Sequence, residues 1–280
     1  MRRLLLPLIA GTIVLGLIVA AVVVAISAAT ARPLASGPVE RGTAFAAVTV
    51  DRLPTEGIVR TGVDDFTFDS FDVEYRLGRD ANGHATLLTT ETLVARFPEF
   101  DQNRGIRRSL PASYQGRTTN LQVISVTDGE GNPRRFEVES SSQVVDVIAA
   151  VPEGQFVRGE QTYVITYSQR DVVDYFANSD AEEFYWNLNG TDWAQPFARV
   201  SARIVLNDGL ENALLGQEAC YRGYFGSTDR CAITRTGGTF AVDELAIGPF
   251  QTVTIAIGFE RGTFTLFDRS YLASPWAWLQ

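Results

Sequence analysis

The residues that could do chemistry in this chain are few in kind. All 24 basic residues are arginine, so lysine chemistry such as Schiff-base formation or phosphate binding by a P-loop is excluded. The single histidine, His84, follows Asn82-Gly83, a pair typical of a turn, which predicts a solvated turn residue rather than a catalytic base. Two cysteines and one histidine are too few for a four-ligand structural zinc site. We therefore expect no metal and no cofactor.

Paired carboxylates offer a remaining route to hydrolysis, because many glycosidases work with two acidic side chains. Five acids surround a single aromatic stretch of the chain: Asp171, Asp174, Glu182, Glu183 and Asp192. Adjacent glutamates are more often solvated surface residues, and hydrolysis requires a carboxyl separation that a sequence does not contain. We therefore keep glycan hydrolysis as an alternative and predict no catalytic residue.

The aromatic stretch itself, F-Y-W-N-L-N-G-T-D-W at residues 184–193, is the least generic part of the chain. Tryptophans can stack on sugar rings, so the first candidates for a binding surface are Trp186, Asn187, Asn189 and Trp193. An architectural role is the favoured interpretation, in which the tryptophans fill the core and the asparagines satisfy backbone groups. Asn189-Gly190-Thr191 also matches a glycosylation acceptor, but its glycine favours a turn.

A second candidate surface is the run R-G-I-R-R, which places Arg104, Arg107 and Arg108 within five residues. Arginine forms bidentate pairs with carboxylates, and the chain has 33 acidic residues to supply them. Internal salt bridges are therefore the favoured interpretation, and an anionic partner is the alternative.

Cys220 and Cys231 are the only cysteines, and they flank a glycine-containing segment. A lone pair of this kind in an exported chain predicts a disulfide. The C-x-x-C spacing of redox enzymes is absent, so we do not expect catalysis by these thiols.

The N-terminus predicts export. Residues 4–31 contain no charged side chain and follow Arg2 and Arg3, a pattern typical of a signal peptide or a signal anchor. The run is long enough to span a membrane, yet Ala29-Thr30-Ala31 has the form of a cleavage site, so both alternatives stay open. Residues 32–42 have the proline and glycine content of a linker. We expect the following domain to lie on the extracytoplasmic side of the cell membrane.

Short alternating runs separated by glycine, proline and aspartate turns dominate the rest of the chain, which predicts a mainly β fold. The clearest unit is a hairpin in which Asp80–Gly83 turns into the alternating run Ala85–Phe97. We predict an antiparallel β-sandwich, immunoglobulin-like or related, over residues 43–262, after an N-terminal hydrophobic helix. This domain is either one unit or two packed β units. Further strands are expected at residues 45–50, 121–126, 136–139, 143–148, 162–168, 184–188, 200–206, 239–245 and 251–259.

Residues 263–280 form an aromatic tail that contains Phe264, Phe267, Tyr271, Trp276 and Trp278. Tryptophan and tyrosine collect where a chain meets the membrane surface. We therefore expect a juxtamembrane tail, with the chain continuing beyond Gln280 into a second membrane span.

Three motifs in order carry a resemblance to a known family: R-G-I-R-R-S-L-P at 104–111, Y-V-I-T-Y at 163–167 and F-Y-W-N-L-N-G-T-D-W-A-Q-P-F at 184–197. Together with the leader, they resemble the bacterial predicted membrane proteins grouped as domain of unknown function 2207. The resemblance covers roughly residues 45–260 and implies an exported β-domain tethered by membrane helices. It implies no catalytic residues, because the family has no established activity.

These features favour a non-enzymatic, membrane-anchored extracytoplasmic module for interaction or sensing, whose ligand the sequence does not name. Its expected partners are the membrane, through the N-terminal segment, and a protein or a glycan outside the cell. The alternative is a carbohydrate-binding or glycan-hydrolysing domain of the cell envelope. The formal net charge of −9 and the lack of a basic stripe argue against a nucleic-acid partner.

Overall fold

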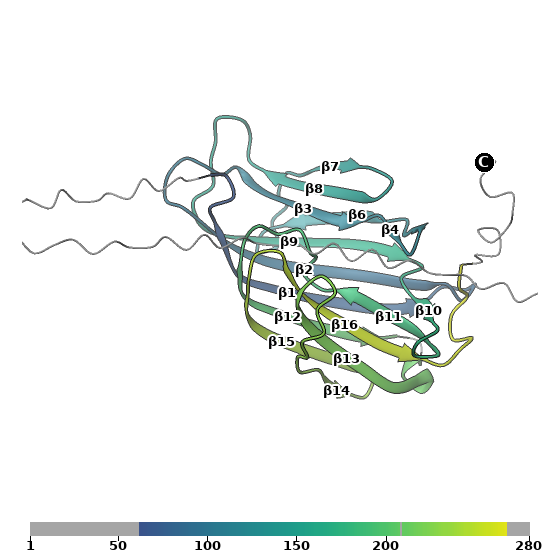
Figure 1. Cartoon of the computed structure of the whole chain (residues 1–280). Helices are drawn as coiled ribbons and strands as arrows, with labels where there is room; N and C mark the ends of the chain where they lie inside the picture. Colours follow the sequence, from purple (N-terminus) through teal and green to yellow (C-terminus); the bar gives the residue numbers. More distant parts are fainter. Residues whose placement is uncertain (1–61, 208, 268–280) are drawn as a thin grey trace, which may run out of the picture. The chain divides into compact units, whose positions relative to one another are not determined.

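The computed structural model describes residues 62–207 and 209–267, and in this range the protein is mainly β (Figure 1). The single helical element there is a 3₁₀ turn at Leu210–Ala213. The segments predicted as leader, linker and first strand, within residues 1–61, lie outside the described residues, and so does the tail from residue 268 onward. The mainly β prediction is confirmed for the part that the structure describes.

The largest sheet has seven strands and supplies one complete layer of the domain. Its strands in spatial order are β14 (Thr234–Thr236), β15 (Thr239–Ile247), β12 (Phe197–Leu206), β1 (Thr67–Arg79), β2 (Ala85–Phe97), β9 (Gly159–Arg170) and β6 (Gln122–Thr127). Buried and exposed side chains alternate along β2, as a strand with one covered face requires.

The β1–β2 hairpin forms as predicted. The carboxylate of Asp80 accepts hydrogen bonds from the backbone amides of Asn82 and His84, which closes the turn. Gly83 has a φ of 84°, a left-handed conformation that glycine adopts without strain. The turn fixes the register, which pairs Arg79 with Ala85 and continues to Thr67 and Arg96 with one irregularity near Phe68.

One pairing departs from the antiparallel arrangement predicted from the sequence. β12 lies parallel to β1, with Phe71 opposite Val200 and Leu77 opposite Leu206. Strand β12 follows about a hundred residues of intervening chain and occupies the edge of β1 that its hairpin partner β2 leaves open. The seven-stranded sheet is therefore mixed.

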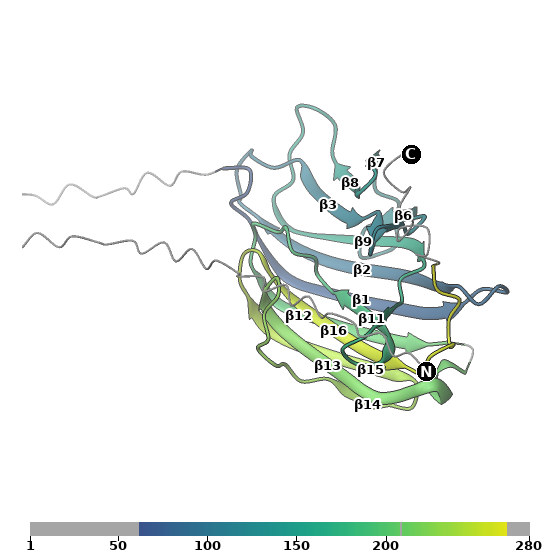
Figure 2. The ribbon, with the colours of Figure 1, turned by 45° about the vertical axis from the view of Figure 1, so that its right-hand side comes forward.

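Two smaller sheets lie against one face of the large sheet (Figures 1 and 2). The first has the order β3 (Gly105–Pro111), β8 (Val144–Ala150) and β7 (Glu137–Ser140), and the second has the order β10 (Asp174–Phe176), β11 (Ala181–Asn187), β16 (Gln251–Phe259) and β13 (Leu214–Tyr224). A two-stranded ribbon, β4 (Ser113–Tyr114) and β5 (Arg117–Thr118), completes the described strands.

Long-range side-chain contacts show that both small sheets cover the same face. Tyr75 of β1 donates a hydrogen bond to the carbonyl of Leu188, just after β11, at 3.0 Å. Glu91 of β2 bonds to Arg108 of β3 at 2.7 Å. Val73 lies opposite Glu91 in the β1–β2 ladder and shares a face with Tyr75, so these two contacts leave the large sheet from one side.

The first residues that follow β16 pack into the core. Phe264 is 5% exposed, and its ring lies 5.3 Å from the ring of Phe259. The carboxylate of Glu182 accepts hydrogen bonds from the amides of Gly262 and Phe264. The first residues of the predicted tail are therefore held against β11.

The predicted disulfide between Cys220 and Cys231 is present. Cys220 lies in β13 and is buried, while the chain between the two cysteines carries the exposed residues Tyr224 and Phe225. The disulfide joins residues eleven positions apart and so restricts one short loop of the unfolded chain.

Removing this crosslink has a defined cost. Replacing Cys220 and Cys231 together with alanine should lower the free energy of unfolding by about 3 kcal/mol, because the unfolded chain regains loop entropy. Urea unfolding of both proteins would measure this difference. Two free thiols in the unreduced, denatured parent protein would contradict the assignment.

Candidate functional site

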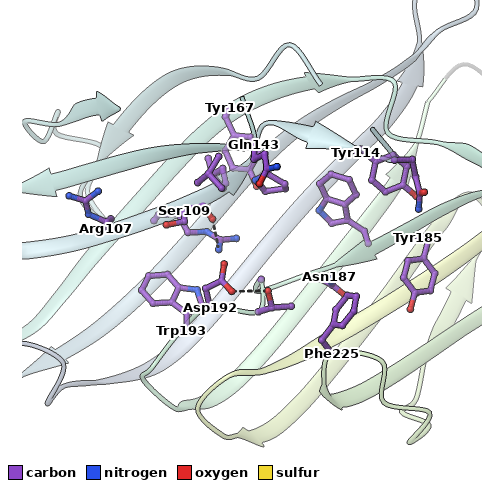
Figure 3. Close-up of a pocket in the computed structure, with 18 residues that line it drawn as sticks. Arg107, Ser109, Tyr114, Gln143, Tyr167, Tyr185, Asn187, Asp192, Trp193 and Phe225 are labelled. Atoms are coloured by element: carbon purple, nitrogen blue, oxygen red, sulfur yellow. Dashed lines mark hydrogen bonds between the residues drawn. The ribbon is translucent and has the colours of Figure 1, made fainter. Parts of the chain in front are cut away.

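A cavity of about 370 Å³ lies between β3 and β11, where the two small sheets approach each other (Figure 3). One wall is formed by residues 107–111 of β3 and the other by Tyr185, Trp186 and Asn187 of β11. Tyr167 of the large sheet lines it as well, together with Tyr114, Gln143, residues 190–193 and Phe225. The lining is therefore rich in aromatic and amide side chains, which is typical of binding pockets.

A buried ion pair lies at the base of this cavity. Arg108 donates from Nε and Nη2 to the two carboxylate oxygens of Glu91, at 2.8 and 2.7 Å. Glu91 is fully buried and Arg108 is 4% exposed. Burial opposes the charged form of arginine, but the carboxylate of Glu91 outweighs it and raises the pKa of Arg108 above its ordinary value. Arg108 is therefore held in its charged form.

Neighbouring groups add further hydrogen bonds to the pair. The hydroxyl of Tyr167 donates to Glu91 at 2.8 Å, and Arg108 Nη1 donates to the carbonyl of Asn189 at 3.1 Å. Trp193 Nε1 donates to the same carbonyl at 2.9 Å, and the guanidinium carbon of Arg108 lies 5.8 Å from the Trp193 ring centre. Side chains or backbone groups from all three sequence motifs thus meet in one cluster.

The turn after β11 is built to reach this cluster. Asn189 is fully buried, and its side chain donates to the carbonyl of Gln251 and accepts from the amide of Val253. The Asn189 side chain therefore links the turn after β11 to β16 by hydrogen bonds. Its amide nitrogen is buried and hydrogen-bonded, which favours the turn over glycosylation at this position.

Gly190 follows directly and has a φ of 82°. A Cβ atom at this position would lie 2.7 Å from Nη1 of Arg108, so the cluster requires glycine for its lack of a side chain as well as for its backbone.

The aromatic candidates Trp186 and Trp193 are buried in the walls of the cavity and are not exposed on the protein surface. Trp186 and Trp193 are 6% and 8% exposed, and the Trp186 ring lies 5.6 Å from the rings of both Phe184 and Tyr114. Asn187 accepts a hydrogen bond from Thr254 Oγ1 at 2.7 Å. These residues line the cavity, and their large faces pack against other rings.

The three arginines of the second candidate surface separate in space. Strand alternation turns Arg108 into the core and Arg107 outward, where Nη1 of Arg107 bonds to Glu139 and Asp146 at 3.0 Å each. Arg104 is exposed and donates to the carbonyl of Val151. Internal pairing is thus observed for Arg107 and Arg108.

Three of the acids considered for hydrolysis, Asp171, Asp174 and Glu182, are engaged elsewhere. Asp174 pairs with Arg117, and Asp171 accepts from His84 across 2.8 Å. His84 is therefore a partly buried residue with a carboxylate partner, and the prediction of a freely solvated turn residue was wrong. Among the described residues, Asp192 is the single acid that lines the cavity. Across the described ranges, 62–207 and 209–267, no cluster of three or more His, Cys, Asp or Glu residues is suited to a metal.

Glu91 was not selected by sequence reasoning, although a signal for it exists. In the run Ala85–Phe97, positions 85, 87, 93 and 95 are apolar and share one face with Glu91. A lone acid on the apolar face of a strand predicts a buried partner, and the three nearby arginines were the candidates. Only the pairing of distant strands identifies Arg108 as that partner.

The family model for the N-terminal domain of a predicted membrane protein, domain of unknown function 2207, matches residues 67–257. The chain belongs to this family. The match spans the three motifs that meet at the Glu91–Arg108 pair and runs nearly from the first described strand to the last. The family resemblance predicted from those motifs is confirmed.

Comparison with solved structures gives similarity of a much weaker kind. An M1 zinc metallopeptidase from Deinococcus radiodurans aligns at 12% identity over 71% of this chain and 45% of its own, with a TM-score of 0.38. A putative protease from Parabacteroides distasonis aligns at 12% identity over 71% and 41%, with a TM-score of 0.39. The chain spans less than half the length of either structure. A search of curated proteins found no match.

The family description concerns a membrane protein, which indicates association with a membrane. Within the described part of the chain, no helix has the length and apolar character needed to cross a bilayer.

Breaking the ion pair from one side should be more costly than replacing both partners. Glu91→Leu leaves the Arg108 charge buried without a counter-ion, so the free energy of unfolding should fall by about 3–5 kcal/mol. The double variant Glu91→Leu/Arg108→Met should lose less than Glu91→Leu alone. Urea unfolding of the two single variants and the double variant completes the cycle, and additive losses would contradict a coupled pair.

Gly190→Ala tests the close approach to Arg108, with Gly131→Ala as its control. Gly131 has a similar φ of 86°, but open space surrounds the position of its Cβ. Both variants carry the left-handed strain of about 1–2 kcal/mol, and Gly190→Ala adds the displacement of a guanidinium that Glu91 holds in place. We expect the extra loss to be on the order of 1 kcal/mol or more in thermal unfolding. Equal losses would show that Arg108 moves aside freely.

Proposed function

We propose that this domain is an extracytoplasmic β-sandwich, held at the cell membrane, that binds a ligand without chemistry in the cavity between β3 and β11. The large sheet forms one layer and the two small sheets form the other. Disulfides persist in oxidising compartments, so the Cys220–Cys231 bond supports a position outside the cytoplasm. The uncharged run at residues 4–31 and the membrane-protein family support attachment to the membrane.

The observation that carries the binding proposal is the cavity above a fully bonded base. Tyr167, Glu91 and Arg108 are hydrogen-bonded to one another, which supports a structural role for this cluster. The walls above it are aromatic and amide side chains, which recognise ligands by contact and hydrogen bonding.

Carbohydrate chemistry is the second candidate and receives less support. Sugar stacking needs an open aromatic face, whereas Trp186 and Trp193 are covered by other rings. Hydrolysis with two carboxylates needs a second acid near Asp192 in the cavity lining, and both Asp174 and Glu182 are bonded elsewhere.

The sidedness has a direct test. Alkaline phosphatase fused after Phe267 should be active in cells, because it folds only where disulfides form, and a green fluorescent protein fusion at the same position should be dark. The control deletes residues 2–31 from both fusions, which should reverse the two signals. Active phosphatase after that deletion would contradict export by the N-terminal segment.

The binding site is tested by a photocrosslinking amino acid placed at Gln143, in the cavity lining, in intact cells. Ile124 is the control position, because it is 56% exposed on β6 and is not one of the residues that line this cavity. We expect a discrete crosslinked band from position 143 and none from position 124. Identical band patterns at the two positions would contradict a ligand site at the cavity.

A further inference from the structure

The two small sheets stop short of each other, and each leaves a strand edge along the cavity. Among the described strands, β3 pairs with β8 alone, over its full length from Gly105 to Pro111. Strand β11 pairs with β16 on one side, while β10 covers its other side only at Ala181–Glu183. One small sheet thus ends at β3, and the other is only partly covered beyond β11.

The main chain of β3 points its spare groups away from β8. The carbonyl of Arg104 accepts from Val151, and the amide of Ala112 donates to Gln143, so even-numbered residues face β8. Because main-chain groups alternate in direction along an antiparallel strand, Arg107 and Ser109 face the opposite edge. The carbonyl of Ser109 accepts from Arg108 Nη1 at 3.4 Å, so the amide is the spare main-chain group of Ser109. Pro111 shares this edge, where its carbonyl accepts from Gln169 at 2.9 Å.

This edge of β3 runs beside open space for most of its length. The cavity of about 370 Å³ is lined by Arg107 to Pro111, and a second cavity of about 510 Å³ is lined by residues 104–107. The two cavities share Arg107, Ser109, Asp192 and Trp193, so they adjoin along the strand.

The edge of β11 is more restricted. The amide of Leu188 donates to Val253 of β16, so Tyr185 and Asn187 direct their main-chain groups toward the cavity. Tyr114 stands over this edge with its ring against Trp186. β3 is therefore the edge with room for another strand.

The charges that line the cavity between β3 and β11 disfavour an anionic ligand. Arg108 is neutralised by Glu91, and Arg107 is bonded to both Glu139 and Asp146. Neither arginine has a charge to spare for a phosphate, a sulfate or a carboxylate, and Asp192 adds a negative charge to the lining. An uncharged occupant with hydrogen-bonding capacity complements such a site.

We propose that the cavity accepts an uncharged, extended peptide segment of a partner protein, which adds as a strand to the open edge of β3. Its main chain bonds to Arg107 and to the amide of Ser109, and its alternate side chains, apolar in character, enter the space lined by Tyr167, Trp186 and Trp193. This inference rests on the proposed binding function and names the ligand of the same cavity.

Selection of displayed ten-residue random peptides on the purified domain provides the probe. The expected peptides are uncharged at their centre, with apolar residues at alternate positions. Methylation of single backbone nitrogens then maps the pairing: alternate positions should lose at least tenfold in Kd and the intervening positions should not. Equal sensitivity at every position, or insensitivity at all of them, would overturn strand addition, and so would a failure to select any peptide.

Ser109→Pro is the matching change in the protein. It removes the amide that faces the cavity, and Pro111 shows that proline is accommodated on this edge. Ser109→Ala is the reference, because both variants lose the hydroxyl that donates to Asp146. Relative to this reference, Ser109→Pro should weaken peptide binding at least tenfold, with circular dichroism confirming that both proteins fold.

The Gln143 crosslink separates this inference from the binding function on which it rests. Loss of the crosslink in Ser109→Pro but not in Ser109→Ala supports strand addition. A crosslink that persists equally in both variants overturns strand addition and leaves the cavity as a ligand site. The absence of any crosslink in the parent protein overturns both.

Discussion

Glu91 and Arg108 carry opposite charges at the place where the three sheets meet and where water is excluded. Transferring each ion from water to such a place costs on the order of several kcal/mol, which only close pairing and complete hydrogen bonding offset. The bidentate contact between Glu91 and Arg108 provides the close pairing. Tyr167 and the carbonyl of Asn189 provide further hydrogen bonds to the two ions. Strands β2, β3 and β9 and the turn after β11 must therefore assemble together, because a missing member would leave a charged group without a partner.

An apolar pair of similar volume could fill this position with equal stability, so stability alone does not account for the charges. The position of β3 suggests another reason. It is an edge strand beside a cavity, and an inward-pointing charge is one way in which proteins prevent indiscriminate pairing at such edges. The Arg108 side chain lies on the core side of β3, where hydrogen bonds to Glu91 and to the Asn189 carbonyl keep it in place. The pair thus keeps a gap between the small sheets that an apolar core would close.

Local chemistry predicted the local parts of this fold. Asp80 and Gly83 specify their turn by hydrogen bonding and backbone conformation, and the alternation along Ala85–Phe97 specifies which face of β2 is buried. The parallel pairing of β1 with β12 was not predictable, because nothing near either strand encodes a partner more than a hundred residues away. The same limit applied to the site: Arg107 and Arg108 looked equivalent, and only the register of β3 against β8 sends one outward and the other to Glu91.

The segments that carry the family resemblance form the base of the cavity, whereas other residues form much of its rim. Contacts with one another hold Asn189, Gly190 and Arg108 in place. A substitution at any of the three would therefore first disturb the buried cluster. The lining residues outside this cluster, such as Gln143 and Phe225, are under no such constraint. Phe225 is 79% exposed at the tip of the disulfide-bounded loop, where a ligand would cover it. The side chains that hold the buried cluster together are therefore different from the side chains at the rim that a ligand would contact.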